Sequence, residues 1–194
     1  MSLDYKITEA GGQILIEAPH NPTFDEKIKR AGAQWDADSK AWRMDAKEIE
    51  TARKAMQLVY GRDDQPCETV SVRVTVKKAW GVTRGPIVIL GRVIAAATGR
   101  DSGARIEKDV AIERGGCDSA GTMANWETII RRRTELVLHD VPKRLVDGND
   151  NDDIEIEILN PAILIPLQTK ALLAERERLL ARLAEIDESL DNLK

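Results

Sequence analysis

Alternating apolar and polar residues dominate the middle of the chain, and this pattern most narrows the folds available to it. "VSVRVTVKK", residues 70–78, places valine at every second position, and "IVILGRVIAAATG", "VAIER" and "ELVLHDV" are further strand-like runs. Side chains that alternate in this way point to opposite faces of a β-strand. Turn-rich segments such as "GRDSGAR" separate the runs. Residues 66–144 are therefore predicted to form an antiparallel β-sheet or a small barrel of about five strands.

The first 62 residues mix strand and helix signals. Residues 13–18 ("QILIEA") read as a strand, and an Asn-Pro pair at 21–22 caps a short helix that Gly32 allows to stop. A capping pattern at 45–48 opens a second helix. The polar segment "GRDDQP" follows, and we place a domain boundary there. Residues 1–62 are thus predicted to be a small module of helices and a β-hairpin.

Two of the four tryptophans, Trp35 and Trp42, flank a polar turn in "GAQWDADSKAWRM". The segment is predicted to form a β-hairpin in which the two rings lie near each other across the strands. Trp35 follows the Gly32 turn, so we expect it to face the helix and fill the core. Trp42 lies between Lys40 and Arg43, and two roles stay open for it: a core residue, or a ring that stacks on a base.

The same segment carries a family resemblance. "FDEKIKRAGAQWDADSKAWRM" resembles the helix, "GArWd", polar turn and "kaW" core of the HARP domain of annealing helicases, and a related module of plasmid and phage proteins linked to primase and antirestriction functions. The resemblance spans residues 13–60, with Gln34 in place of the usual basic residue. It implies that this module engages DNA, and it suggests a phage or other mobile element as the source. The matching positions are Gly32, Ala33, Trp35, Asp36, Lys40, Ala41 and Trp42.

The net charge of -4 conceals a division along the chain. Residues 66–144 hold fourteen basic and nine acidic side chains, whereas residues 145–194 hold five and twelve. A positive middle segment can attract phosphates, and the alternative is that its charges only solvate one face or edge of the sheet. The candidates for nucleic-acid binding are basic residues or rings close to them in sequence: Lys40, Trp42, Arg43, Lys77, Lys78, Trp126, Arg131, Arg132 and Arg133.

The last fifty residues carry a different pattern. Residues 145–160 are predicted to be an acidic linker with a short strand, and residues 161–194 a long coiled-coil helix. Self-association through this helix is favoured, while Arg176 on the seam keeps antiparallel pairing or docking onto another protein open. The seam residues step by four and three: Leu172, Leu179, Leu183, Ile186, Leu190 and Leu193. With this helix the predicted fold class is α+β.

Motifs for catalysis, metal binding and membrane insertion are missing from the sequence. It has no P-loop, dinucleotide fingerprint or nucleophile elbow, so we expect no enzyme and no cofactor. The two cysteines and two histidines are far apart in sequence, and the acidic run at 147–153 lacks EF-hand spacing, so no metal is expected. No apolar run approaches the roughly 18 residues of a membrane span and the start lacks a secretory signal, which favours the cytoplasm.

These observations favour an accessory protein that binds DNA or RNA, without enzymatic activity and oligomeric through its C-terminal helix. One alternative is a protein-interaction module that inhibits or scaffolds a host complex, such as a defence complex. A second alternative is a small protein that binds a nucleotide in a pocket of the sheet.

Overall fold

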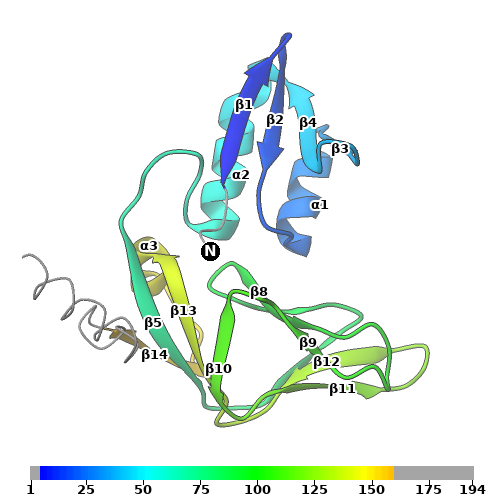
Figure 1. Cartoon of the computed structure of the whole chain (residues 1–194), viewed down its shortest axis with the longest axis vertical. Coiled ribbons are helices and arrows are strands. Elements are labelled where there is room, and N and C mark those ends of the chain that lie inside the picture. The colour runs from blue at the N-terminus through cyan, green and yellow to red at the C-terminus, as the bar shows by residue number, and fades with distance from the viewer. Residues whose placement is uncertain (1–4, 160–194) are drawn as a thin grey trace, which may run out of the picture. The chain divides into compact units, whose positions relative to one another are not determined.

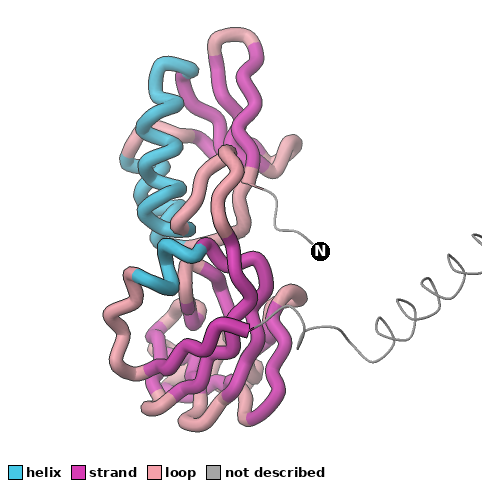
Figure 2. Tube along the Cα trace, turned by 90° about the vertical axis from the view of Figure 1, so that its left-hand side faces the viewer, coloured by secondary structure: helices cyan, strands magenta, loops and turns pink. Residues whose placement is uncertain are grey.

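The computed structural model describes residues 5–159, which form a mostly β protein (Figures 1 and 2). Strands hold 45% of the described residues and helices 19%. The predicted α+β class is therefore wrong, because the sequence contains more short strands than its helical signals suggested. The predicted helix at 161–194, with its seam of Leu172, Leu179, Leu183, Ile186, Leu190 and Leu193, lies outside the described residues, and no long C-terminal helix lies within them.

The N-terminal part is a four-stranded antiparallel sheet with helices against one face (Figure 2). The strand order is β1-β2-β4-β3, so β1 and β3 are its edges. Its elements in chain order are β1 (Lys6–Ala10), β2 (Gln13–Glu17), α1 (Pro22–Arg30), β3 (Gln34–Asp36), β4 (Ala41–Asp45), the 3-10 turn η1 (Ala46–Glu48) and α2 (Ile49–Tyr60).

The predicted cap of α1 acts as expected, whereas the capping pattern at 45–48 caps η1 through Asp45 and leaves α2 without a side-chain cap. The Asn21 side chain accepts hydrogen bonds from the backbone N–H groups of Thr23 and Phe24, at 2.9 and 3.3 Å, and so caps α1. Gly61 ends α2 with φ +70°, in the left-handed region. The apolar sides of both helices and of β2 and β4 form one core, whose largest members are Ile14, Ile16, Phe24, Ile28, Trp42, Met56 and Tyr60.

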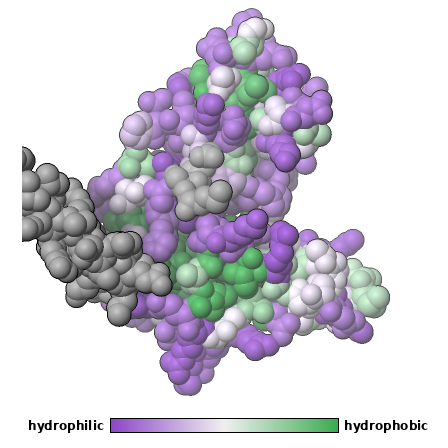
Figure 3. Space-filling view, viewed as in Figure 1, coloured by the Kyte–Doolittle hydropathy of each residue, from purple (hydrophilic) through white to green (hydrophobic). Residues whose placement is uncertain are grey.

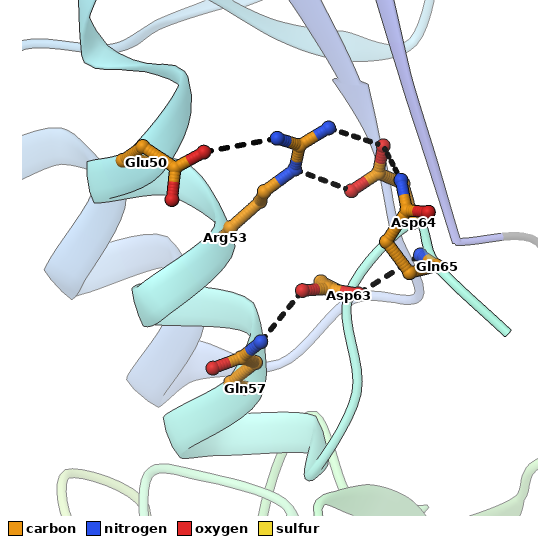
Figure 4. A network of polar contacts seen from close by, with 6 residues as sticks. All are labelled: Glu50, Arg53, Gln57, Asp63, Asp64 and Gln65. Atoms are coloured by element: carbon orange, nitrogen blue, oxygen red, sulfur yellow. Dashed lines mark hydrogen bonds and ion pairs between the residues drawn. The ribbon is translucent and has the colours of Figure 1, made fainter. Parts of the chain in front are cut away.

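The segment after α2 in which we place the domain boundary is tied to that helix (Figure 4). Arg53 donates from Nε and Nη2 to the two carboxylate oxygens of Asp64, at 2.9 and 3.1 Å. Gln57 Nε2 donates to Asp63 Oδ2 at 2.7 Å, and Asp63 is buried. The hydrogen bonds from Arg53 hold the pKa of Asp64 below its usual range. The aspartates of "GRDDQP" therefore anchor the chain as it leaves α2.

The following residues form three antiparallel sheets around a second core. The valines of "VSVRVTVKK" point inward as the alternation predicted, and Val72, Val74 and Val76 are fully buried. The sheet orders are β10-β13-β5-β14, β11-β12-β6 and β7-β8-β9. The elements are β5 (Thr69–Val76), β6 (Trp80–Thr83), β7 (Ile87–Ile89), β8 (Arg92–Ala96), β9 (Arg105–Ile106), β10 (Val110–Arg114), β11 (Cys117–Gly121), β12 (Trp126–Ile130), β13 (Glu135–Pro142), α3 (Lys143–Asp147) and β14 (Ile154–Leu159).

The two cores belong to one compact unit that reaches Ile158. Asn21 donates from Nδ2 to the Gly91 carbonyl at 2.9 Å, and Arg62 donates from Nη1 to Asp140 at 3.0 Å. The cap of α1 thus also binds the turn between β7 and β8. The division into domains at residues 62–66 stays a prediction, although each side of it has its own core.

Candidate nucleic-acid interface

Two of the predicted basic clusters meet at one end of the second core. Strands β5, β10 and β12 finish there and β13 begins there, at the lower end of Figure 1. The Arg133 backbone N–H donates to the Val76 carbonyl at 2.7 Å, and Arg132 Nε donates to the Lys77 carbonyl at 3.1 Å. Lys77 and Lys78, which follow β5, are therefore held against the turn at 131–134.

A buried threonine fixes the conformation of this turn. Thr134 is fully buried, and its hydroxyl donates to the Arg131 carbonyl at 2.7 Å and accepts the Gly116 N–H at 3.1 Å. Gly115 has φ +77°, and a Cβ there would lie 2.8 Å from Thr134 Cα, so the two segments meet closely at a glycine. The backbone that carries the three arginines is thus held by the segment at Gly115 and Gly116 on one side and by Val76 on the other.

Arg114, which directly precedes Gly115, also lies at this end of the core, although it was not identified from the sequence. Arg114 ends β10 directly before Gly115, and its side chain is 70% exposed. Its sequence neighbours "IE" and "GG" carry no basic cluster, so only the register of β10 with β13 places it here. We call the assembled group the basic end, and it comprises Lys77, Lys78, Arg114, Arg131, Arg132 and Arg133, all exposed.

Carboxylates neutralise part of the basic end. Arg131 pairs with Asp118 at 2.6 Å, and Arg114 lies 3.5 Å from Glu135. The Ser119 backbone N–H and the Arg131 guanidinium together hold the pKa of Asp118 below its usual range.

The other four cations of the basic end form no ion pair within residues 5–159: Lys77, Lys78, Arg132 and Arg133. The backbone N–H groups of Lys77 and Lys78 donate to the Asp153 carbonyl, at 2.8 and 3.4 Å, so the acidic run adjoins the cluster through its backbone. In Figure 3 this end of the molecule is hydrophilic.

The tryptophan beside the basic end is Trp80 and not Trp126, which we expected there from the sequence. Trp126 begins β12 and pairs with Gly121, whereas Arg131 follows the last residue of that strand. Four residues of extended chain cover about 13 Å, so Trp126 lies far along the strand from the arginines. Trp80 pairs with Ile130 instead, and its half-buried ring packs against the core beside the basic end. Proximity in sequence was the wrong guide for Trp126 because β12 is fully extended.

The two tryptophans of the N-terminal hairpin differ in burial, and only one of the two roles left open for Trp42 fits the structure. Trp42 is 6% exposed and belongs to the core, so its ring has no free face for a base. Trp35, which we expected in the core, is 53% exposed. The register pairs Trp35 with Trp42 and Trp42 with Ile16, so all three side chains point to the helix-covered face. The expected direction of Trp35 was therefore right, but β3 is an edge strand with no neighbour to cover the ring.

The remaining predicted residues of the hairpin are exposed. Arg43 forms an ion pair with Asp36 across the two strands. Lys40 lies in the turn between β3 and β4, with φ +52°. Both residues belong to the N-terminal sheet rather than to the sheets that form the basic end.

The two cysteines differ in their surroundings, which gives a testable difference in reactivity. Cys67 is exposed, whereas burial raises the pKa of Cys117 to about 11 against the opposing effect of Arg131. Because the thiolate is the reactive form, Cys117 should react with Ellman's reagent at pH 8 roughly a hundredfold more slowly than Cys67. The slow rate should rise about tenfold per pH unit between pH 8 and 10, since the thiolate fraction does so below the pKa.

The Cys117→Ala variant is the control for this experiment, because it should lose the slow phase and keep the fast one. Equal rates for the two thiols of the parent would contradict the buried position of Cys117.

Comparison with protein families, curated proteins and solved structures gives no match for this chain. Across residues 5–159, no helix has the length and apolar character needed to cross a membrane. In the same part of the chain, no three His, Cys, Asp or Glu side chains come together as a possible metal site.

Proposed function

We propose that this chain is a nucleic-acid-binding accessory protein that holds phosphate groups at the basic end. The observation that carries the proposal is the convergence of six cationic side chains from three separate connections, the ends of β5 and β10 and the turn between β12 and β13. Four of these six have no carboxylate partner within the described residues. Phosphate oxygens are the natural partners of such guanidinium and ammonium groups.

The backbone geometry favours phosphate binding over the alternative that these cations only solvate an edge of the sheet. A solvating residue needs no fixed position, whereas here Thr134, Gly115 and the Arg133–Val76 hydrogen bond fix the turn. Arg133 also adopts φ +63°, which is unusual for a residue other than glycine. A fixed backbone lowers the entropy lost when the side chains engage a ligand.

The resemblance of residues 13–60 to the HARP domain points in the same direction and underlies the proposed origin in a phage or other mobile element. The proposed place of action is the cytoplasm. Trp80, beside the basic end, adds an aromatic edge that a flexible single strand can approach more readily than a duplex.

Replacing Arg131, Arg132 and Arg133 together with alanine should weaken binding to unrelated sequences by about tenfold or more at low salt. The slope of log affinity against log salt should flatten by roughly two units, since each phosphate contact contributes about 0.7 for single strands and 0.9 for duplex. The measurement is a fluorescence-anisotropy salt titration with single-stranded, duplex and forked oligonucleotides.

The matched control removes three other exposed cations: Lys54, Arg105 and Arg144. It changes the net charge equally, so it should keep most of the affinity and of the slope if the basic end is the binding surface. An equal loss in both triple variants would attribute binding to overall charge. No binding by the parent to any substrate at low salt would overturn the proposal.

A further inference from the structure

We infer that Trp35 is the side chain of the N-terminal module that stacks on an unpaired base of a single-stranded nucleic acid. This inference rests on the proposed function. It adds a second contact with the nucleic acid, made by the N-terminal module rather than by the basic end. The starting observation is that Trp35 is 53% exposed, although the chain has only seven aromatic residues and buries Trp42 beside it.

The ring of Trp35 is exposed but held in position. Its centroid lies 5.2 Å from that of Trp42, with the planes at 65°, an edge-to-face contact. Trp42 in turn is fixed in the core by Ile16 on the neighbouring strand and by the helices. Trp35 therefore needs no reorganisation before a base stacks on the part of its surface that solvent now covers.

Its position at the edge of the sheet leaves room for a ligand. In the strand order β1-β2-β4-β3, the outer side of β3 has no strand beside it within residues 5–159 (Figure 1). Trp35 and Trp42 share the face on which α1 lies, and the open indole lies against Trp42, whose ring is contacted by Lys29 of that helix. A planar ligand can reach the ring without displacing any core side chain.

The charges around the ring favour an anionic ligand. Lys29 of α1 places its Nζ 5.3 Å from the centroid of the Trp42 ring, which puts a cation beside the Trp pair. Lys40 is a second exposed cation, in the turn that joins β3 to β4, where the exposed carboxylate of Asp38 offsets part of its charge. Asp36 faces Arg43 and forms an ion pair with it, which neutralises that carboxylate. A ring with nearby ammonium groups matches a base joined to phosphates.

The test compares two strands of equal length and charge, one of thymidines and one of abasic sugar-phosphate units. Trp35→Ala in the full chain should weaken binding to the thymidine strand by roughly 5- to 150-fold, the cost of one lost stacked base. It should leave binding to the abasic strand unchanged, because the phosphates are the same. Trp35→Phe should recover part of the loss because a smaller ring still stacks.

Leu58→Ala is the matched control, since Leu58 is, with Trp35, a large exposed apolar side chain of residues 5–60, at 65%. It should bind both strands like the parent. All variants are first shown to be folded at the temperature of the binding experiment, since Trp35→Ala is expected to lose only about 0.5–1.5 kcal/mol of unfolding free energy with the aromatic pair.

Two results would overturn the inference while leaving the proposed function intact. One is parental affinity of Trp35→Ala for the thymidine strand, and the other is an equal loss on both strands. A parent that binds neither strand would overturn both proposals. In that case, loss of a dimer by Trp35→Ala in light scattering would show that the edge of β3 binds a second copy of the chain.

Discussion

Replacing Trp42 with alanine should lower the free energy of unfolding by about 3–5 kcal/mol. The ring is almost fully buried between β2, β3 and the helices, and the small N-terminal core has few side chains of comparable size to close the cavity. Lys29 would also lose the ring that its ammonium group contacts. Urea unfolding followed by circular dichroism measures the change from the midpoint and slope.

Trp35→Ala is the control for Trp42, because it removes the same ring from the paired position on the edge strand. Its expected cost is about 0.5–1.5 kcal/mol, the value of the lost aromatic pair. If Trp35→Ala destabilises the protein as much as Trp42→Ala, then Trp35 is buried and the assignment of the two rings is wrong. The pair therefore tests the register of the hairpin as well as its core.

Local signals predicted most of the individual elements. The Asn21 cap, the left-handed Gly32 and the buried valines of β5 each depend on residues a few positions apart, and the structure places them as expected. The overall class was wrong because seven consecutive strands, β6 to β12, have only two to five residues each. Runs this short carry too few alternating positions to be recognised among turns.

The candidate interface was predictable in its parts but not in its assembly. The basic runs at Lys77–Lys78 and Arg131–Arg133 are visible in the sequence, yet their contact depends on the pairing of β5 with β13, about 60 positions away along the chain. Arg114 was missed because it has no basic neighbour in sequence. Trp35 was misassigned to the core and the role of Trp42 was left open because both point to the same face, and only the strand order decides which one has a neighbour to cover it.

Replacing Gly91 with alanine should destabilise the protein by roughly 2–4 kcal/mol, through backbone strain and a steric clash together. Gly91 has φ +74°, a conformation that costs an alanine about 1–2 kcal/mol. An added Cβ would also lie 2.4 Å from the Val59 carbonyl oxygen and 3.1 Å from Tyr60 Cα. Both are backbone atoms of α2, so the clash is relieved only if the β7–β8 turn moves away from the helix.

That movement would also break the hydrogen bond from Asn21 Nδ2 to the Gly91 carbonyl, so the residue that caps α1 loses its contact with the second core. Gly99→Ala is the matched control, because a Cβ there meets nothing within 4 Å, and thermal unfolding should be close to that of the parent. A broader, two-step transition in Gly91→Ala would show that the two cores unfold separately once this contact is lost. A parental melting temperature in Gly91→Ala would contradict the close approach of the turn to α2, and with it the packing of the N-terminal module on the β-rich core.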